Sequence, residues 1–188
     1  MNRQQLSGKK VAILVTNGFE QVELTEPRDA LKDAGAEAQI VSPEKRHVKG
    51  WKLTDWGDTF DVDVVLKKAR PEDFDALLLP GGVLNPDTLR IDEDAIAFIK
   101  HFVAAKKPIA AICHGPWTLI EAGAVAGRTM TSYGSIKSDL KNAGANWIDE
   151  AVVVDRGLVT SRNPGDLKAF NKKMIEEFAE GPHTRASV

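Results

Sequence analysis

The chain has 188 residues, of which 43% are hydrophobic and 28% are charged, and its formal net charge is -2. These values exclude a natively disordered chain and are typical of a globular protein with a sizeable core. At roughly 150 residues per domain, we expect a single domain over 1–188. The 25 Lys and Arg residues are matched by 27 Asp and Glu residues, which argues against nucleic acid as a primary partner.

The amino-terminal region contains no run that is long enough for a membrane segment. Its most apolar stretch is Val11 to Val15, whereas a secretory signal needs about 7 to 15 apolar residues and a membrane helix about 20. The single cysteine, Cys113, excludes an intramolecular disulfide, and we expect a cytoplasmic protein. The four histidines lack zinc-binding spacing, so we expect neither a metal nor another cofactor.

Short apolar segments alternate with segments of helical periodicity along most of the chain. This pattern predicts an α/β fold, a three-layer sandwich in which helices cover both faces of a mainly parallel sheet. The expected buried strands are 10–15, 38–42, 76–80 and 108–112. The expected helices are 23–34, which either starts near Pro27 or is kinked there, a helix from Asp92 to Lys107, and one after Pro164 that includes Phe178.

Three further segments have weaker patterns. Two short apolar runs flank Arg156 and Gly157, which predicts a β-hairpin. The segment Trp51 to Leu66 contains several Asp residues, a Gly and two Trp residues, and we expect an excursion or hairpin outside the core. The last eight residues, 181–188, are expected to form a frayed tail.

The cysteine lies where the strand 108–112 ends and a helix should begin. A nucleophile on such a tight turn needs small residues two positions before and after it, and Ala111 and Gly115 satisfy this rule. At the start of a helix the backbone N–H groups would lower the pKa of the thiol, and His114 is adjacent as a base or imidazolium partner. A buried, inert structural cysteine is the alternative.

Two other segments should reach the same edge of the sheet. Gly82 follows the strand 76–80, and its N–H is a candidate oxyanion donor together with that of His114, although most Gly-Gly pairs form ordinary turns. Glu20 and Glu23 follow the first strand and point toward the cysteine in this scheme, or else only complement a helix dipole. Asp87 behind the glycines is a third acidic candidate, or a loop or cap residue.

Five motifs taken together resemble one known family. They are TNGFEQVEL, LLLPGGVLNPDTLR, AAICHGPWTLIEAG, TSYGSIKSDLKNAG and VVVDRGLVTSR, and the similarity extends from about Lys10 to Phe178. They are similar to the PfpI-like intracellular cysteine proteases, which belong to the superfamily of the parkinsonism-associated protein deglycase. The resemblance implies a flavodoxin-like, class I glutamine amidotransferase-like fold.

The resemblance also implies roles for the candidate residues. The family nucleophile matches Cys113, and its neighbouring histidine matches His114. The glutamate that hydrogen-bonds the thiol matches Glu23, its companion acid matches Glu20, and the oxyanion glycine matches Gly82.

A further acid and the assembly follow from the resemblance alone. Where the archaeal proteases use a glutamate to reach the histidine of a neighbouring subunit, this chain has the shorter Asp87, in a loop one residue longer. A homodimer or hexamer is implied. The leading functional hypothesis is a cytosolic stress-protective hydrolase, a deglycase acting on methylglyoxal or glyoxal adducts. The alternatives are an intracellular peptidase and a non-catalytic, redox-responsive chaperone or general stress protein.

Overall fold

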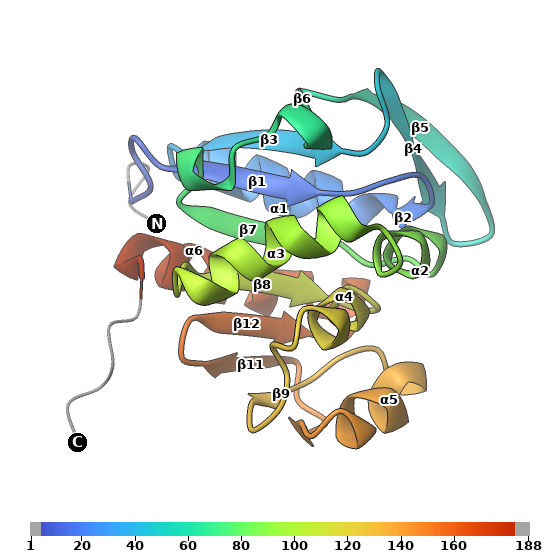
Figure 1. The fold of residues 1–188 in the computed structure, drawn as a ribbon, viewed down its shortest axis with the longest axis vertical. Helices are drawn as coiled ribbons and strands as arrows, with labels where there is room; N and C mark the ends of the chain where they lie inside the picture. Colours follow the sequence, from blue (N-terminus) through green and yellow to red (C-terminus); the bar gives the residue numbers. More distant parts are fainter. Residues whose placement is uncertain (1–4, 183–188) are drawn as a thin grey trace.

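A seven-stranded sheet forms the centre of the molecule (Figure 1). The structure, a computed structural model, describes residues 5–182. The strands of this sheet are β1 (Lys10–Leu14), β3 (Glu37–Ser42), β6 (Val64–Val65), β7 (Ala76–Leu79), β8 (Ile109–Ile112), β11 (Val152–Asp155) and β12 (Leu158–Ser161). Their order is β11-β12-β8-β7-β1-β3-β6, with β11 antiparallel to β12 and the other neighbours parallel.

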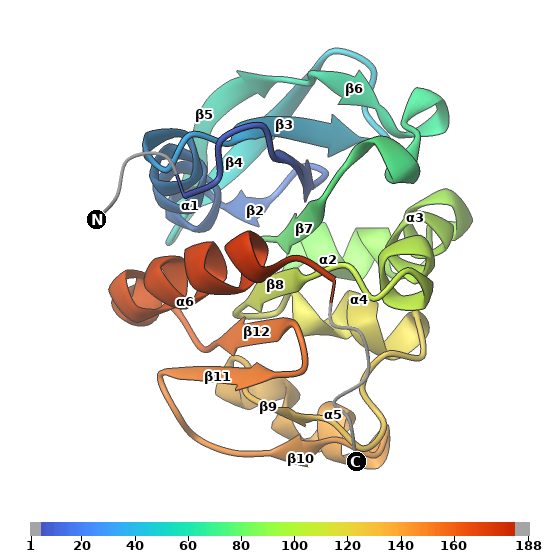
Figure 2. The ribbon, with the colours of Figure 1, turned by 90° about the vertical axis from the view of Figure 1, so that its left-hand side faces the viewer.

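Helices cover both faces of the sheet, as the sequence pattern predicted (Figure 2). The α-helices are α1 (Gln21–Asp33), α2 (Leu84–Leu89), α3 (Glu93–Ala104), α4 (Pro116–Glu121), α5 (Lys137–Asn142) and α6 (Leu167–Glu180). Short 3-10 turns are η1 (Leu66–Lys68), η2 (Pro71–Asp73), η3 (Gly134–Ile136) and η4 (Pro164–Asp166). Helices α1 and α6 lie on one face of the sheet, and α3 and α4 lie on the other. The predicted three-layer α/β sandwich is therefore confirmed.

The two faces of the sheet bury two separate hydrophobic clusters. Along β1, Val11 and Ile13 belong to the cluster that includes α1 and α6, whereas Ala12 and Leu14 belong to the cluster that includes α3. Successive residues of a strand point to opposite faces, so a strand buried on both sides has to be apolar throughout. This requirement explains the continuous apolar runs from which the central strands were predicted.

The helix boundaries follow local signals with one correction. Helix α3 begins after Asp92, whose side chain accepts a hydrogen bond of 3.0 Å from the Ala95 N–H. Pro164 opens the turn η4, which leads directly into α6. Helix α1 starts at Gln21 and runs through Pro27, so the alternative in which it begins near the proline is wrong.

Two small sheets extend from the central sandwich. The strands β2 (Phe19–Glu20), β4 (His47–Lys52) and β5 (Asp55–Asp61) form one of them, and the antiparallel β4–β5 pair is the hairpin expected in this region. The strands β9 (Thr129–Met130) and β10 (Asn146–Trp147) form the other, which the sequence did not predict. Strands of two residues are too short to have a recognisable hydrophobic period.

The chain reverses between β11 and β12 at the predicted hairpin turn. Arg156 and Gly157 both have positive φ, 47° and 82°, as a tight two-residue turn requires. At the carboxyl terminus the prediction of a frayed tail over 181–188 falls mostly on residues 183–188, which lie outside the described residues.

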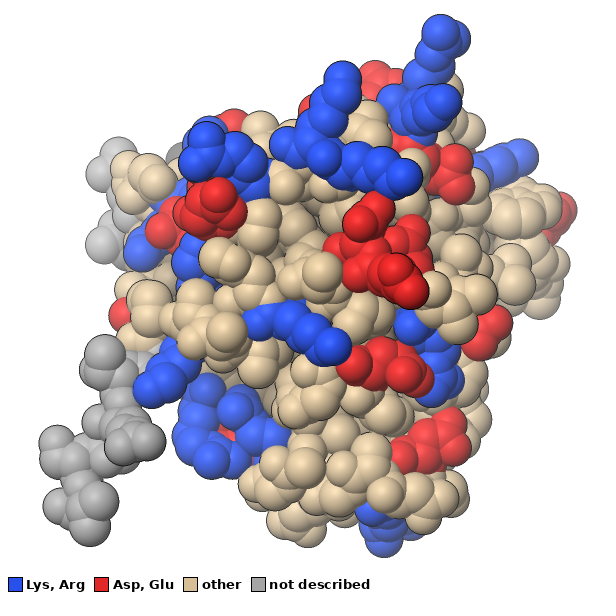
Figure 3. Space-filling view, viewed as in Figure 1, with Lys and Arg blue, Asp and Glu red and all other residues tan. Residues whose placement is uncertain are grey.

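Positive and negative side chains are interspersed over the face of the molecule in Figure 3. This distribution agrees with a formal net charge of -2. Within residues 5–182 no helix has the length and apolar character that crossing a bilayer requires.

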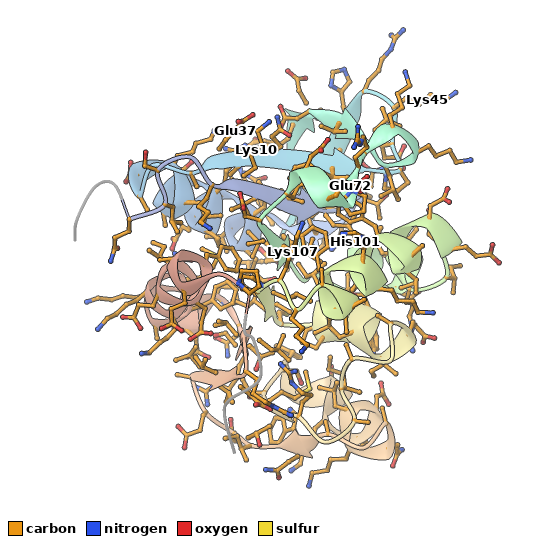
Figure 4. All side chains as sticks on the ribbon, turned by 60° about the vertical axis from the view of Figure 1, so that its left-hand side comes forward. Lys10, Glu37, Lys45, Glu72, His101 and Lys107 are labelled. Carbon is orange, nitrogen blue, oxygen red and sulfur yellow. The ribbon has the colours of Figure 1, made fainter. Side chains whose placement is uncertain are left out.

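The amino end of β8 is fixed by Lys107, which precedes the strand (Figure 4). Its Nζ donates to the carbonyl oxygens of Pro71, Glu72 and Phe74 at 3.2, 3.2 and 2.5 Å. The ammonium group also lies 5.5 Å from the centre of the Phe102 ring. These contacts use the ammonium to satisfy three carbonyl groups of the loop that contains η2.

Candidate active site

Cys113 occupies a tight turn between β8 and α4, at the edge where the parallel strands end. Its φ is +62°, a left-handed conformation that is uncommon for a residue with a side chain. A Cβ added to Gly115 would lie 2.5 Å from the Leu79 carbonyl oxygen, so this position must be glycine. The geometry is that of the nucleophile turn predicted from the small residues around the cysteine.

The neighbouring His114 reaches back to the thiol. Cys113 Sγ lies 3.1 Å from His114 Nδ1, and both residues are only 6% exposed. The other imidazole nitrogen, Nε2, lies 3.0 Å from the Ser135 hydroxyl. Burial lowers the pKa of His114, so the imidazole is neutral at neutral pH and available as a base.

Glu23 lies beside the thiol and is fully buried. Its Oε2 accepts a hydrogen bond of 2.9 Å from the Gly81 N–H, while Oε1 is buried without a hydrogen bond of good geometry. Burial raises the pKa of Glu23 to about 8, against the opposing effects of the Gly81 N–H and the Cys113 thiol. The carboxyl group is therefore protonated at neutral pH and can donate its proton toward the sulfur.

The thiol itself is less acidic than the sequence predicted. Burial raises the pKa of Cys113, and the Glu23 charge acts in the same direction when that carboxyl is ionised. The backbone N–H groups of Gly82 and His114 lower the pKa of the thiol, as expected at the start of a helix, but desolvation outweighs them. The predicted depression of the pKa is wrong, and the thiol needs a base to become a nucleophile.

The two glycines after β7 fit closely against the site. Gly82 has a φ of +73°, and an added Cβ would lie 2.4 Å from the Gly18 carbonyl oxygen. A Cβ on Gly81 would lie 2.6 Å from both the Cys113 Cβ and Glu23 Oε2. Close backbone approach therefore brings the Gly82 N–H to the sulfur, in the region where the sequence expected an oxyanion donor.

The other two acidic candidates lie farther from the thiol. Glu20 is half-buried, and its Oε1 accepts a hydrogen bond of 3.4 Å from the Leu53 N–H at the tip of the β4–β5 hairpin. Burial raises the pKa of Glu20. Asp87 lies exposed in the first turn of α2, and its carboxylate makes no hydrogen bond or ion pair within residues 5–182. Within one chain, the histidine is contacted by Ser135 and not by Asp87.

Sequence reasoning missed the segment that covers His114. The Tyr133 ring stacks on the imidazole with centroids 4.7 Å apart and an angle of 24° between the planes. On another side Trp117 meets the imidazole edge-on at 5.3 Å and donates its indole N–H to Asp139. Tyr133 and Ser135 lie in one of the five motifs that resemble the PfpI-like family. Neither residue type, however, indicates a catalytic role by itself.

The site shows no arrangement for a metal ion. Among the described residues, no group of three or more His, Cys, Asp or Glu side chains is placed to bind one.

A sequence model of the DJ-1/PfpI family matches residues 9–177, a range that contains every candidate residue above. The chain belongs to the DJ-1/PfpI family.

Relatives of this chain include proteins with named roles. General stress protein 18 of Bacillus subtilis is 46% identical over 170 residues, 89% of this chain and 96% of that protein. A deglycase of Thermococcus kodakarensis is 43% identical over 167 residues, 89% of this chain and 98% of that protein. The crystal structure of DJ-1beta from Drosophila melanogaster superimposes with a TM-score of 0.83 at 29% identity, covering 91% of this chain and 90% of the other. These matches confirm the family resemblance and the fold.

Proposed function

We propose that this DJ-1/PfpI family protein is a cysteine hydrolase that removes methylglyoxal or glyoxal adducts from amino, guanidino or thiol groups. The observation that carries the proposal is the 3.1 Å contact between the Cys113 thiol and a neutral, buried His114 nitrogen. A buried thiol with an adjacent base, a carboxyl group and two backbone N–H donors is the equipment of nucleophilic catalysis. The 43% identity to an archaeal deglycase supports the choice of substrate.

The chemistry follows from the contacts. His114 Nδ1 removes the thiol proton, and the sulfur of Cys113 attacks the adduct carbon that bears the amine. The carbon–nitrogen bond breaks, and the amine leaves with the proton that His114 carried. The fragment left on sulfur is a ketone beside a thiohemiacetal carbon. The thiohemiacetal carbon then loses its proton to give an enediol, the neighbouring carbon gains a proton, and the hydroxyl proton passes to the former ketone oxygen. The product is a thioester of lactate, and water then releases lactate and restores the thiol.

The remaining candidates support this reaction from around the sulfur. Protonated Glu23 adds no negative charge near the thiolate, because burial raises the pKa of its carboxyl group to about 8. The N–H groups of Gly82 and His114 stabilise the oxyanion that forms during thioester hydrolysis. Glu20 acts farther from the sulfur, where it holds the tip of the β4–β5 hairpin by accepting a hydrogen bond from the Leu53 N–H.

The test is lactate release from a methylglyoxal-glycated peptide after free methylglyoxal has been removed. The native protein should release lactate, and Cys113→Ala should release none above the uncatalysed rate, because the nucleophile is gone. Glu26→Gln changes an exposed residue of α1 and serves as a handling control. Undiminished release by Cys113→Ala contradicts the proposal. No release by a folded native protein would transfer the assignment to a peptidase or to a role without turnover.

The second candidate is a stress protein that responds to oxidation of its cysteine. The 46% identity to a general stress protein supports it. Peroxide in slight excess over the two equivalents that the reaction consumes should then add two oxygen atoms to Cys113, giving a sulfinic acid visible by intact mass, and should change the protein's ability to prevent aggregation of a client. Cys113→Ala is the control for oxidation elsewhere. An oxidised protein with unchanged holdase behaviour contradicts this role.

We also propose a cytoplasmic homo-oligomer, a dimer or a hexamer. The apolar side chains of Val83 and Leu84 lie at the start of α2, the helix that contains Asp87, and they are 53% and 49% exposed. Their burial against a second copy would bring Asp87 near another chain, as the archaeal resemblance implies. Sedimentation should show an oligomer that Leu84→Glu dissociates, with Leu53→Glu as a matched exposed control. A native protein that sediments as a monomer at micromolar concentration contradicts this proposal.

A further inference from the structure

Ser135 is the partner that the structure gives to the outer nitrogen of His114. Its hydroxyl lies 3.0 Å from His114 Nε2, while Nδ1 on the same ring faces the Cys113 sulfur at 3.1 Å. The two contacts lie on opposite sides of the imidazole and form a chain of Cys113, His114 and Ser135. A group that contacts Nε2 influences which ring nitrogen carries the proton.

The segment that carries Ser135 is fixed to the nucleophile turn at two other points. The Tyr133 N–H donates to the Cys113 carbonyl oxygen at 2.9 Å, and the Tyr133 ring stacks on His114. The Ile136 N–H donates to the Tyr133 carbonyl oxygen at 3.2 Å, which closes the turn η3 around Ser135. The hydroxyl is therefore held in position relative to the imidazole by backbone contacts rather than by its own bond alone.

The tautomer of His114 decides whether it can act as a base toward the thiol. With the proton on Nε2, donated to Ser135 Oγ, the lone pair of Nδ1 points to the sulfur and can accept the thiol proton. With the proton on Nδ1, the nitrogen that faces the sulfur has no lone pair to offer. The Cys113 thiol is kept protonated by burial and needs an acceptor, so the first arrangement satisfies all three groups.

We propose that Ser135 is a positioning residue, whose hydroxyl oxygen accepts a hydrogen bond from the Nε2–H of His114 and thereby keeps Nδ1 as the base for the Cys113 thiol. The proposal deepens the proposed function and rests on it for the identity of the base. It gives the orienting role within one chain to a hydroxyl rather than to Asp87, whose carboxylate makes no hydrogen bond or ion pair with a described residue. A neutral hydroxyl orients the imidazole without adding the charge of a carboxylate.

The first measurement is the rate at which iodoacetamide alkylates Cys113, the chain's single cysteine, from pH 6 to pH 10. At pH 7 we expect Ser135→Ala to react about five- to tenfold more slowly than the native protein, the effect of losing roughly one neutral hydrogen bond. The difference should shrink as pH rises, because hydroxide then removes the thiol proton without His114. Ser135→Thr keeps the hydroxyl and should restore the rate to within about twofold.

The second measurement is the imidazole nitrogen spectrum of His114 in protein labelled with ¹⁵N, assigned by comparison with His114→Gln. In the native protein Nε2 should have the shift of a protonated nitrogen and Nδ1 that of an unprotonated one. In Ser135→Ala the two shifts should move toward each other, because both tautomers are populated. Ser138→Ala changes an exposed serine in α5 without a contact to the imidazole and is the matched control.

Several outcomes overturn the proposal. The first is an unchanged alkylation rate together with unchanged nitrogen shifts in Ser135→Ala. The second is faster alkylation of Ser135→Ala at every pH, which indicates a loosened site. The third is a Ser135→Thr variant that reacts as slowly as Ser135→Ala. A loss in Asp87→Asn that is absent in Ser135→Ala also overturns it. Both measurements need no substrate, so a native protein that releases no lactate but shows the Ser135 effect refutes the deglycase function and leaves the positioning role intact.

Discussion

The two ends of β8 carry polar groups that are treated in opposite ways. At the amino end the Lys107 ammonium donates to three backbone carbonyl oxygens. At the carboxyl end Cys113 has a strained backbone, and Glu23 is fully buried with one oxygen that lacks a good hydrogen bond. One strand thus connects a polar cluster whose hydrogen bonds are satisfied to a polar cluster whose backbone strain and buried carboxyl group reduce the stability of the fold.

This difference separates residues that stabilise the fold from residues that the fold has to support. A satisfied buried polar group contributes modestly to stability, whereas an unsatisfied or strained one reduces it and persists where function requires it. The carboxyl end of the sheet should therefore become more stable, and less reactive, when its ionisable groups are neutralised. The amino end should only lose stability when it is altered.

The largest effect should come from Glu23→Gln. Unfolding returns the raised pKa of Glu23, about 8, to an ordinary value near 4.5, so the folded protein binds one more proton between those pH values and loses stability as pH rises. Glutamine removes this pH dependence. Between pH 5 and pH 9 the unfolding free energy of the native protein should therefore fall by roughly 4 kcal/mol more than that of Glu23→Gln. Urea unfolding from pH 5 to pH 9 measures the difference, with Glu26→Gln as control. Parallel pH profiles of native protein and Glu23→Gln would show that Glu23 is ionised in the folded state.

A somewhat smaller loss is expected from Gly82→Ala. The new Cβ would combine a positive φ with a contact of 2.4 Å to the Gly18 carbonyl oxygen, and unfolding free energy should fall by roughly 3 kcal/mol. Gly123→Ala has a comparable φ of +69° with open space around the Cβ, so it measures the backbone strain alone. Equal losses in the two variants would mean that the close approach at Gly82 relaxes without cost.

Lys107→Met tests the satisfied end of β8. It keeps an unbranched apolar stem but removes the donor for the Pro71, Glu72 and Phe74 carbonyl groups. Unfolding free energy should fall by about 2 kcal/mol at all pH values near neutrality. Lys106→Met, at an exposed neighbour, is the control. A stable Lys107→Met variant would show that water replaces the ammonium and that the comparison between the two ends fails.

The smallest effect should come from the exposed ion pair on the neighbouring strands. Lys10 Nζ and Glu37 Oε2 lie 3.6 Å apart at the amino ends of β1 and β3 (Figure 4). A double-mutant cycle with Lys10→Ala and Glu37→Ala should give a coupling energy below about 0.5 kcal/mol, since solvent screens the pair. A coupling above about 1 kcal/mol would mean that electrostatics contributes at this end as well.

The central fold could be predicted because both faces of its strands are buried. That condition leaves continuous apolar runs such as 10–15 and 76–80, which have few other interpretations. The turn at Cys113 could be predicted for a related reason, because Ala111 and Gly115 are needed where backbone segments touch. Steric requirements of this kind are local and leave a direct mark on residue type.

The chemistry of the site was less predictable because it depends on burial and on distant segments. Glu20 and Glu23 are the same residue type near the start of one helix, so the sequence does not distinguish them. The fold buries Glu23 completely, whereas Glu20 contacts the tip of a hairpin. The family resemblance pointed to an acid, Asp87, as the partner of His114 across a subunit interface, which one chain does not test. Nothing in the sequence pointed to Ser135, which contacts His114 within the chain. Desolvation likewise reversed the expected direction of the thiol pKa.

The attachment of the segment from Tyr133 to Ile136 has a consequence for how this protein can change over generations. The nucleophile is built into the central sheet, while the segment that covers His114 follows a peripheral two-residue strand. Mutations of its exposed side chains, those of Tyr133 and Ser135, can alter the reactivity of the cysteine without removing a side chain from the buried core, to which Ile136 belongs. Related proteins can therefore differ in cysteine reactivity with little loss of stability, and protein engineers can randomise this short segment.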